Sequence, residues 1–161
     1  MRIRTRLTAL VLVAALAALP GAAHARQKKY FKAKIGSITL HAIKRGIQGV
    51  VIIGGGGFTL NAPGRKGFTA QLLALVCESP GGITVGATYS CGGAFGQSNP
   101  RRPTQPKGWS SNDQVQVTVT AYSGTYLAGT LSGTLENPGD QNPNDGPAAI
   151  SGKFGSPMIQ Q

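Results

Sequence analysis

Residues 114–135 read QVQVTVTAYSGTYLAGTLSGTL, and this stretch decides the fold class. Valine or leucine stands at positions 115, 117, 119, 127, 131 and 135, while glutamine, threonine and serine occupy most positions between them. This alternation is typical of a β-strand that turns one face to a core and the other to water. Residues 122–125, Tyr-Ser-Gly-Thr, interrupt it with residues that favour turns. We therefore expect two antiparallel strands, at 114–121 and 126–135.

Alternation of the same kind recurs before and after this stretch. Further strands are expected at 31–35, 38–42, 50–53, 83–91 and 148–154. The inward-facing parity reverses at Gly36 and Ser37, which predicts a bulge or a tight turn. Residues 70–76 contain good helix formers and are compatible with a two-turn helix, but the strand signals beside them favour a strand. The long glycine- and proline-rich connection at 92–108 is expected to be a mobile loop.

Together these elements predict an all-β fold of about seven strands, arranged as an antiparallel two-sheet β-sandwich or a barrel-like sheet pair. The chain has 161 residues, of which 40 % are apolar and 13 % charged. That composition argues against a disordered chain, and the length fits a single domain. No apolar run is long enough to cross a membrane as a helix.

The first 25 residues have the pattern of a secretory signal peptide. Arginines at positions 2, 4 and 6 precede an uncharged segment at 7–19, and Ala23-His24-Ala25 supplies the small residues of a cleavage site. A short membrane anchor is the alternative, but the apolar run is too short for one. We therefore expect a signal peptide at 1–25, a single β-domain at 26–161, and an exported protein, either periplasmic or extracellular.

The charge of the chain is strongly positive and unevenly distributed. There are 16 lysines and arginines against 5 acids, which gives a formal net charge of +11, and Glu78 is the only acid between residues 26 and 107. Such asymmetry favours an anionic partner, such as the phosphates of lipopolysaccharide or teichoic acid. A merely solvated face, with lysines that guard an edge strand, is the alternative. No nucleic-acid-binding motif is present, so nucleic acid is not expected. The candidate polyanion contacts are Lys28, Lys29, Lys32, Lys34, Arg101 and Arg102, with Lys44, Arg45, Arg65, Lys66 and Lys107 in nearby predicted loops.

Two cysteines, Cys77 and Cys91, are candidates for a disulfide in an exported protein. If a tight turn at 78–82 leads directly into a strand at 83–91, however, Cys91 lies on the order of 27 Å from the turn. Bridged α-carbons must lie within about 7 Å, so the chain would have to bend back or cross to another sheet. Two separate buried thiols are the alternative. A metal pair is not expected, because the chain lacks suitable additional ligands.

No catalytic or cofactor-binding motif stands out. His41 is the single histidine beyond residue 25, and we expect it on the surface; a hydrolase that uses His41 is the least favoured hypothesis. The glycines at 54–57 lack the spacing of a phosphate-binding loop and predict a flexible hairpin loop. Residues 140–146 resemble the start of a calcium loop, but the glycine is misplaced and a solvated turn is favoured. We expect no metal and no cofactor.

The last third of the chain resembles a group of small exported bacterial β-sandwich proteins of unknown function, many of them lipoproteins. Their last strands carry a "GTFSGTL…ISGTF" pattern, and this chain has Gly-Thr-Leu-Ser-Gly-Thr-Leu at 129–135 and Ile-Ser-Gly-Lys-Phe at 150–154. Phe-Lys-Ala-Lys-Ile at 31–35 and Gly-Ala-Thr-Tyr at 86–89 are also similar. The chain departs from the group in its basic first half and in lacking a lipidation cysteine. The resemblance implies a fold and an exported location, and it supplies no catalytic residues.

The sequence thus favours a non-enzymatic binding or structural module of the periplasm or cell envelope. The main alternative is the same fold with a basic surface that binds anionic envelope polymers. The partner and the oligomeric state are left open.

Overall fold

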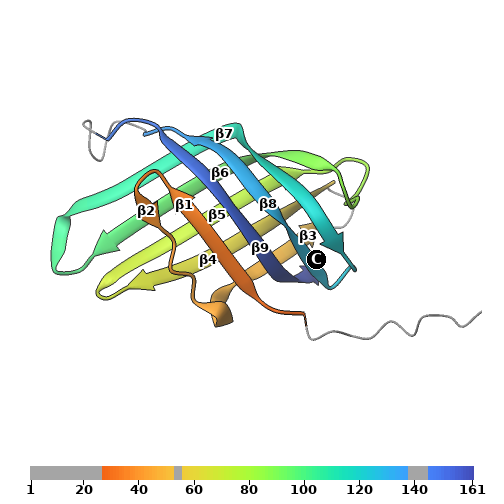
Figure 1. Cartoon of the computed structure of the whole chain (residues 1–161), viewed down its shortest axis with the longest axis horizontal. Helices are drawn as coiled ribbons and strands as arrows, with labels where there is room; N and C mark the ends of the chain where they lie inside the picture. Colours follow the sequence, from red (N-terminus) through yellow and green to blue (C-terminus); the bar gives the residue numbers. More distant parts are fainter. Residues whose placement is uncertain (1–26, 53–55, 138–144) are drawn as a thin grey trace, which may run out of the picture.

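The computed structural model describes residues 27–52, 56–137 and 145–161. The expected signal peptide at 1–25, part of the glycine segment at 54–57 and most of the 140–146 segment lie outside these residues. Figure 1 shows β-strands wrapped around a common interior, with one short helical turn at the edge. Among the described residues no helix is long and apolar enough to cross a membrane. The elements are β1 (Tyr30–Ile35), β2 (Ile38–Thr39), the 3-10 helix η1 (Lys44–Gly46), β3 (Gln48–Ile52), β4 (Gly57–Lys66), β5 (Thr69–Glu78), β6 (Thr88–Asn99), β7 (Arg102–Tyr122), β8 (Tyr126–Leu135) and β9 (Ala148–Gln160).

The strands form a single sheet in the order β2-β1-β9-β3-β4-β5-β6-β7-β8, and a further pairing between β9 and β8 closes it into a ring. All neighbours are antiparallel except β3 and β9, which run parallel. The expected all-β fold is therefore confirmed. The strands close into one barrel rather than dividing into two sheets, and one pairing departs from the expected antiparallel arrangement.

Strand β9 closes the barrel by pairing with three strands. Along one edge it pairs with β8 from Ala148 to Pro157. Along the other edge, the part from Ile150 to Gly155 pairs with β1, and the part from Met158 to Gln160 pairs with β3. The strands β1 and β3 thus lie one after the other along the same edge of β9. The segment that joins β1 to β3 lies against β4.

A buried glutamine holds this bridging segment. Ala42 forms a β-bridge with Gly64 of β4. The Gln71 side chain, on the inner side of β5, accepts a hydrogen bond from the His41 backbone N–H (3.0 Å) and donates one to the Thr39 carbonyl (3.2 Å). An amide side chain offers both a donor and an acceptor, so Gln71 satisfies two backbone groups, the Thr39 carbonyl and the His41 N–H, and ties this segment to β5.

The interior is filled by alternate residues of every long strand. The valines and leucines expected to face the core at 115, 117, 119, 127, 131 and 135 are all buried. Phe31 and Phe154 stack with ring centroids 5.7 Å apart, and Phe95 and Trp109 stack at 6.0 Å. Ala121 shares the parity of the valines but is exposed, because a register shift after Val119 turns it outward.

The two cysteines form a disulfide, Cys77–Cys91, with α-carbons 4.1 Å apart. They lie directly opposite each other on β5 and β6. The strand expected at 83–91 was too long: β6 begins at Thr88, Val85 is 55 % exposed, and residues 79–87 form a loop. The Tyr89 hydroxyl accepts a hydrogen bond from the Thr84 N–H (2.7 Å) and donates one to the Gly82 carbonyl (3.0 Å), which folds this loop back. The α-carbons of Cys77 and Cys91 can lie this close because a loop, and not a tight turn, joins β5 to β6.

The prediction of a mobile loop at 92–108 is wrong, because these residues form the paired ends of β6 and β7. At Gly93, side chains from neighbouring strands occupy the space that a larger residue would need. A Cβ on Gly93 would lie only 2.9 Å from the Leu75 side chain, so a larger residue would collide there. The strand expected at 70–76 is confirmed as part of β5, and the tight turn at Gly36 is confirmed by its φ of +54°.

Candidate functional site

The outer face of β1 carries lysines directly above a buried apolar row. Phe31, Ala33 and Ile35 are buried, and Lys32 and Lys34 between them are exposed. Lys32 lies opposite Lys153 of β9 in the antiparallel register. Side chains at such paired positions leave the sheet from Cβ atoms about 5 Å apart. The neighbouring strands β1 and β9 therefore place two ammonium groups on the same outer face of the sheet.

Further cations surround this pair. Lys28 and Lys29 precede β1, and Lys44 and Arg45 come from η1. With Gln27, Tyr30, Lys32 and Lys153 they line an open depression of about 930 Å³, so six of its eight lining residues are basic. A second depression of about 640 Å³ shares Lys32 and Lys153 and adds Lys34. We call the seven cations the basic face: Lys28, Lys29, Lys32, Lys34, Lys44, Arg45 and Lys153.

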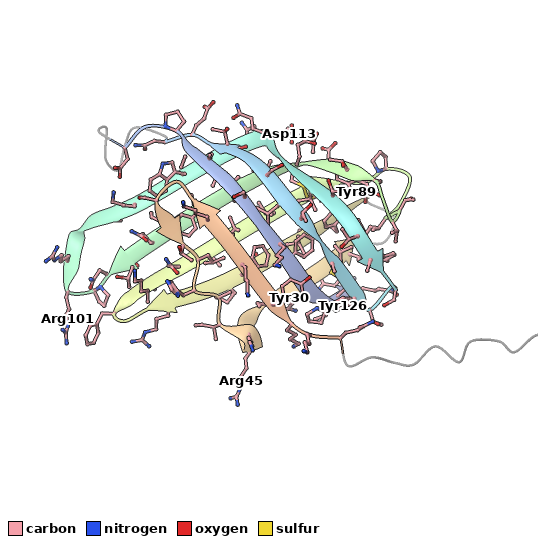
Figure 2. The ribbon with its side chains drawn as sticks, viewed as in Figure 1. Tyr30, Arg45, Tyr89, Arg101, Asp113 and Tyr126 are labelled. Carbon is pink, nitrogen blue, oxygen red and sulfur yellow. A yellow bond between two sulfur atoms is a disulfide. The ribbon has the colours of Figure 1, made fainter. Side chains whose placement is uncertain are left out.

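A tyrosine pair fixes one end of the basic face. Figure 2 shows Tyr30 and Tyr126 beside each other at the lower end of β1 and β8. The Tyr126 hydroxyl donates a hydrogen bond to the Lys28 carbonyl (3.0 Å), which holds the chain that enters β1. Gly155 lies beneath them, and a Cβ there would come 2.1 Å from the Tyr126 oxygen, so only glycine fits. Burial, with a smaller contribution from Tyr30, raises the pKa of Tyr126 above its usual value and keeps this hydroxyl protonated.

The charges of the basic face are not neutralised by the acids that the structure describes. The ion pair found within the described ranges is Lys107–Asp145 (2.9 Å), and neither residue belongs to the basic face. Like charges directly opposite each other in a sheet destabilise it. Clustered cations also create a potential that concentrates anions at the surface. The arrangement costs stability and attracts anions.

The candidate polyanion contacts fall into two groups. Lys28, Lys29, Lys32 and Lys34 all belong to the basic face. Arg101 and Arg102 lie at the turn between β6 and β7, at the far end of the barrel, where Figure 2 shows Arg101 well apart from Tyr30. Lys153 was not among the candidates, because nothing in the sequence reveals that β9 pairs with β1.

The remaining candidates for chemistry are His41 and possible metal ligands. His41 is exposed, as expected, and its described hydrogen bonds are made by its backbone. Within residues 27–52, 56–137 and 145–161, no group of three or more His, Cys, Asp or Glu side chains could hold a metal ion. Comparisons with models of known protein families, with curated proteins and with solved structures found no match. The function must therefore be argued from the surface of the barrel itself.

Proposed function

We propose that this protein is a non-enzymatic binding module of the periplasm or cell exterior, and that its basic face binds an anionic polymer. The observation that carries the proposal is the pairing of Lys32 with Lys153, surrounded by five more cations. A surface that needed only solubility would gain from acids interspersed among these lysines. Phosphate groups of an envelope polymer such as lipopolysaccharide or teichoic acid would supply the missing negative charge.

The shape of the basic face favours a polymer over a small anion. Its two depressions are open and adjoin at Lys32 and Lys153, so they form a continuous surface and not a closed pocket. Lys32 and Lys34 are two residues apart on one strand, which separates their Cα atoms by about 7 Å. Cations repeated at such intervals suit a ligand with repeated anionic groups.

The alternative in which the lysines of β1 merely guard an edge strand has less support. Strand β1 pairs with β9 along its whole length. Its other edge is also occupied at residues 33–35, because Lys34 and Ile35 pair with β2 and the Leu40 N–H donates to the Ala33 carbonyl (2.9 Å). Residues 33–35 therefore have partners on both edges and need no lysine against edge-to-edge aggregation, whereas the described residues give the edge at 30–32 no partner on the β2 side. Hydrolysis by His41 likewise has no observation in its favour.

The test compares two double variants that remove the same charge. Lys32→Gln with Lys153→Gln alters the basic face, and Arg65→Gln with Lys66→Gln alters the end of β4. Each is eluted with salt from heparin and from a cation exchanger of matched charge density. If the basic face is the site, the first variant elutes earlier from heparin specifically, and the slope of log affinity against log salt falls by about 0.7–0.9 for each lysine removed. Equal effects of both variants on both columns would contradict the proposal.

A further inference from the structure

Two hairpin turns meet at the end of the barrel away from the tyrosine pair. Residues 67 and 68 join β4 to β5, and residues 100 and 101 join β6 to β7. The Arg101 guanidinium carbon lies 3.3 Å from the centre of the Phe68 ring, so the turns touch. Figure 2 shows Arg101 at the extreme end of the molecule. We call these two turns and their flanking residues, 65–68 and 99–102, the hairpin end.

The hairpin end exposes apolar surface. Phe68 is 50 % exposed, and so is Leu72, four residues further along β5. Leu72 lies between Pro63 of β4 and Gly96 of β6 in the register. A Cβ built on Gly96 would meet no atom within 4 Å, so Leu72 projects beside an unfilled space. Two large apolar side chains are thus half-exposed on β5 and the turn that leads into it.

Cations surround this apolar surface. Arg65, Lys66, Arg101 and Arg102 are all exposed and take part in no ion pair found among the described residues. The Arg65 Nε donates to the Gly67 carbonyl (2.8 Å), which holds its side chain across the turn. The acid of β5, Glu78, stands at the opposite end of that strand. The hairpin end therefore combines a projecting phenyl ring with an unbalanced positive charge.

We propose that the hairpin end docks onto an anionic lipid surface, with Phe68 inserted at the level of the headgroups. Peripheral binding of this kind combines buried apolar area with attraction to anionic lipids. The convex turns suit a flat surface, and the long arginine side chains can reach the phosphates while the ring enters the apolar layer. A soluble polyanion would use the arginines but leave Phe68 and Leu72 in water. This surface is distinct from the basic face, so the inference goes beyond the proposed function.

The experiment measures co-sedimentation of the full chain with vesicles. The vesicles contain equal parts of phosphatidylglycerol and phosphatidylcholine, and phosphatidylcholine alone is the reference. Binding is expected with the anionic vesicles. Arg101→Gln with Arg102→Gln should bind about 30-fold more weakly, since each charge near such a surface contributes about fivefold. Phe68→Ser should bind about tenfold more weakly, as expected for the loss of one apolar anchor.

Two variants act as controls. Val85→Ser removes a side chain of similar exposure, 55 %, from the 79–87 loop and should leave vesicle binding unchanged. Lys32→Gln with Lys153→Gln should retain vesicle binding, which separates this proposal from that for the basic face. Thermal unfolding without lipid shows whether each variant is folded. If a variant is not folded, Phe68→Trp is used instead. The new tryptophan reports insertion directly, because its emission should shift to the blue with anionic vesicles. Trp109 is already buried and should not contribute to that shift.

Three results would overturn the inference. The first is an absence of binding to anionic vesicles. The second is full binding by folded Phe68→Ser with no spectral shift of Phe68→Trp, which would mean adsorption by charge alone. The third is loss of vesicle binding on substitution of Lys32 and Lys153 but not of Arg101 and Arg102. Since the proposed function is read from heparin elution, either proposal can fail while the other stands.

Discussion

Replacing Lys153 by glutamine should make the protein more stable and a weaker anion binder at the same time. Lys32 and Lys153 are directly opposite on β1 and β9. Their ammonium groups, on flexible stems, can separate to roughly 7–8 Å, where Coulomb's law in a water-like dielectric gives a repulsion of about 0.5 kcal/mol. Favourable cross-strand pairs contribute a similar magnitude, about 0.2–1 kcal/mol, with the opposite sign. The free energy of unfolding should therefore rise by about 0.5 kcal/mol and Tm by about 2 °C.

The assay is thermal and urea unfolding at low salt and at 1 M salt, where charges are screened beyond about 3 Å. The gain in stability should be present at low salt and disappear at 1 M. Lys66→Gln is the matched control, since Lys66 lies opposite Thr69 and should change stability little. A loss of stability in Lys153→Gln at low salt, or a gain that persists in 1 M salt, would refute the reasoning. Elution from heparin measures the accompanying loss of anion affinity.

Three further outcomes follow from the fold. Reduction of the Cys77–Cys91 bond, which closes a loop of about 15 residues, should lower the free energy of unfolding by about 3 kcal/mol, measured in urea with and without reductant. Gln71→Leu should cost about 1–2 kcal/mol, because two partly buried backbone groups lose their partner, and should speed hydrogen exchange at the His41 amide. The raised pKa of Tyr126 means that the folded state favours the protonated hydroxyl, so stability should fall as the pH rises above about 10; Tyr126→Phe should flatten that decline in pH-dependent unfolding.

Alternation of residue types predicted those elements in which one face meets the core. In 114–135 apolar side chains alternate with polar ones, and the predicted strand 126–135 forms as β8, while the predicted strand 114–121 is the last part of the longer β7. The same rule places Lys32 and Lys34 on the outer face of β1, because Phe31, Ala33 and Ile35 must face inward. Such predictions succeed because the signal is local and requires no knowledge of the neighbouring strand.

The failures depended on contacts between distant segments. Residues 92–108 have the composition of a loop, yet most of them lie in paired strands of β6 and β7, and at Gly93 the Leu75 side chain fills the space beside the backbone. The register that sets Lys153 beside Lys32 depends on β9 returning to β1, which no local pattern encodes. The sequence therefore named six of the seven cations of the basic face, and the barrel topology supplied Lys153.

The three pairings of β9 also have a consequence for how the chain folds. Strands β4 to β8 can form in succession as neighbouring hairpins, with little loop entropy to overcome. Strands β1 and β3 cannot complete their pairing until β9 arrives, since Ile35 pairs with Ile150 and Val50 with Ile159. Contacts so far apart along the chain slow folding, and the free edges of β1, β3 and β8 stay available for wrong pairing until the ring closes. We expect closure by β9 to limit the rate of folding, so that substitutions in β9 alter the refolding rate more than equally destabilising ones in the β5–β6 hairpin.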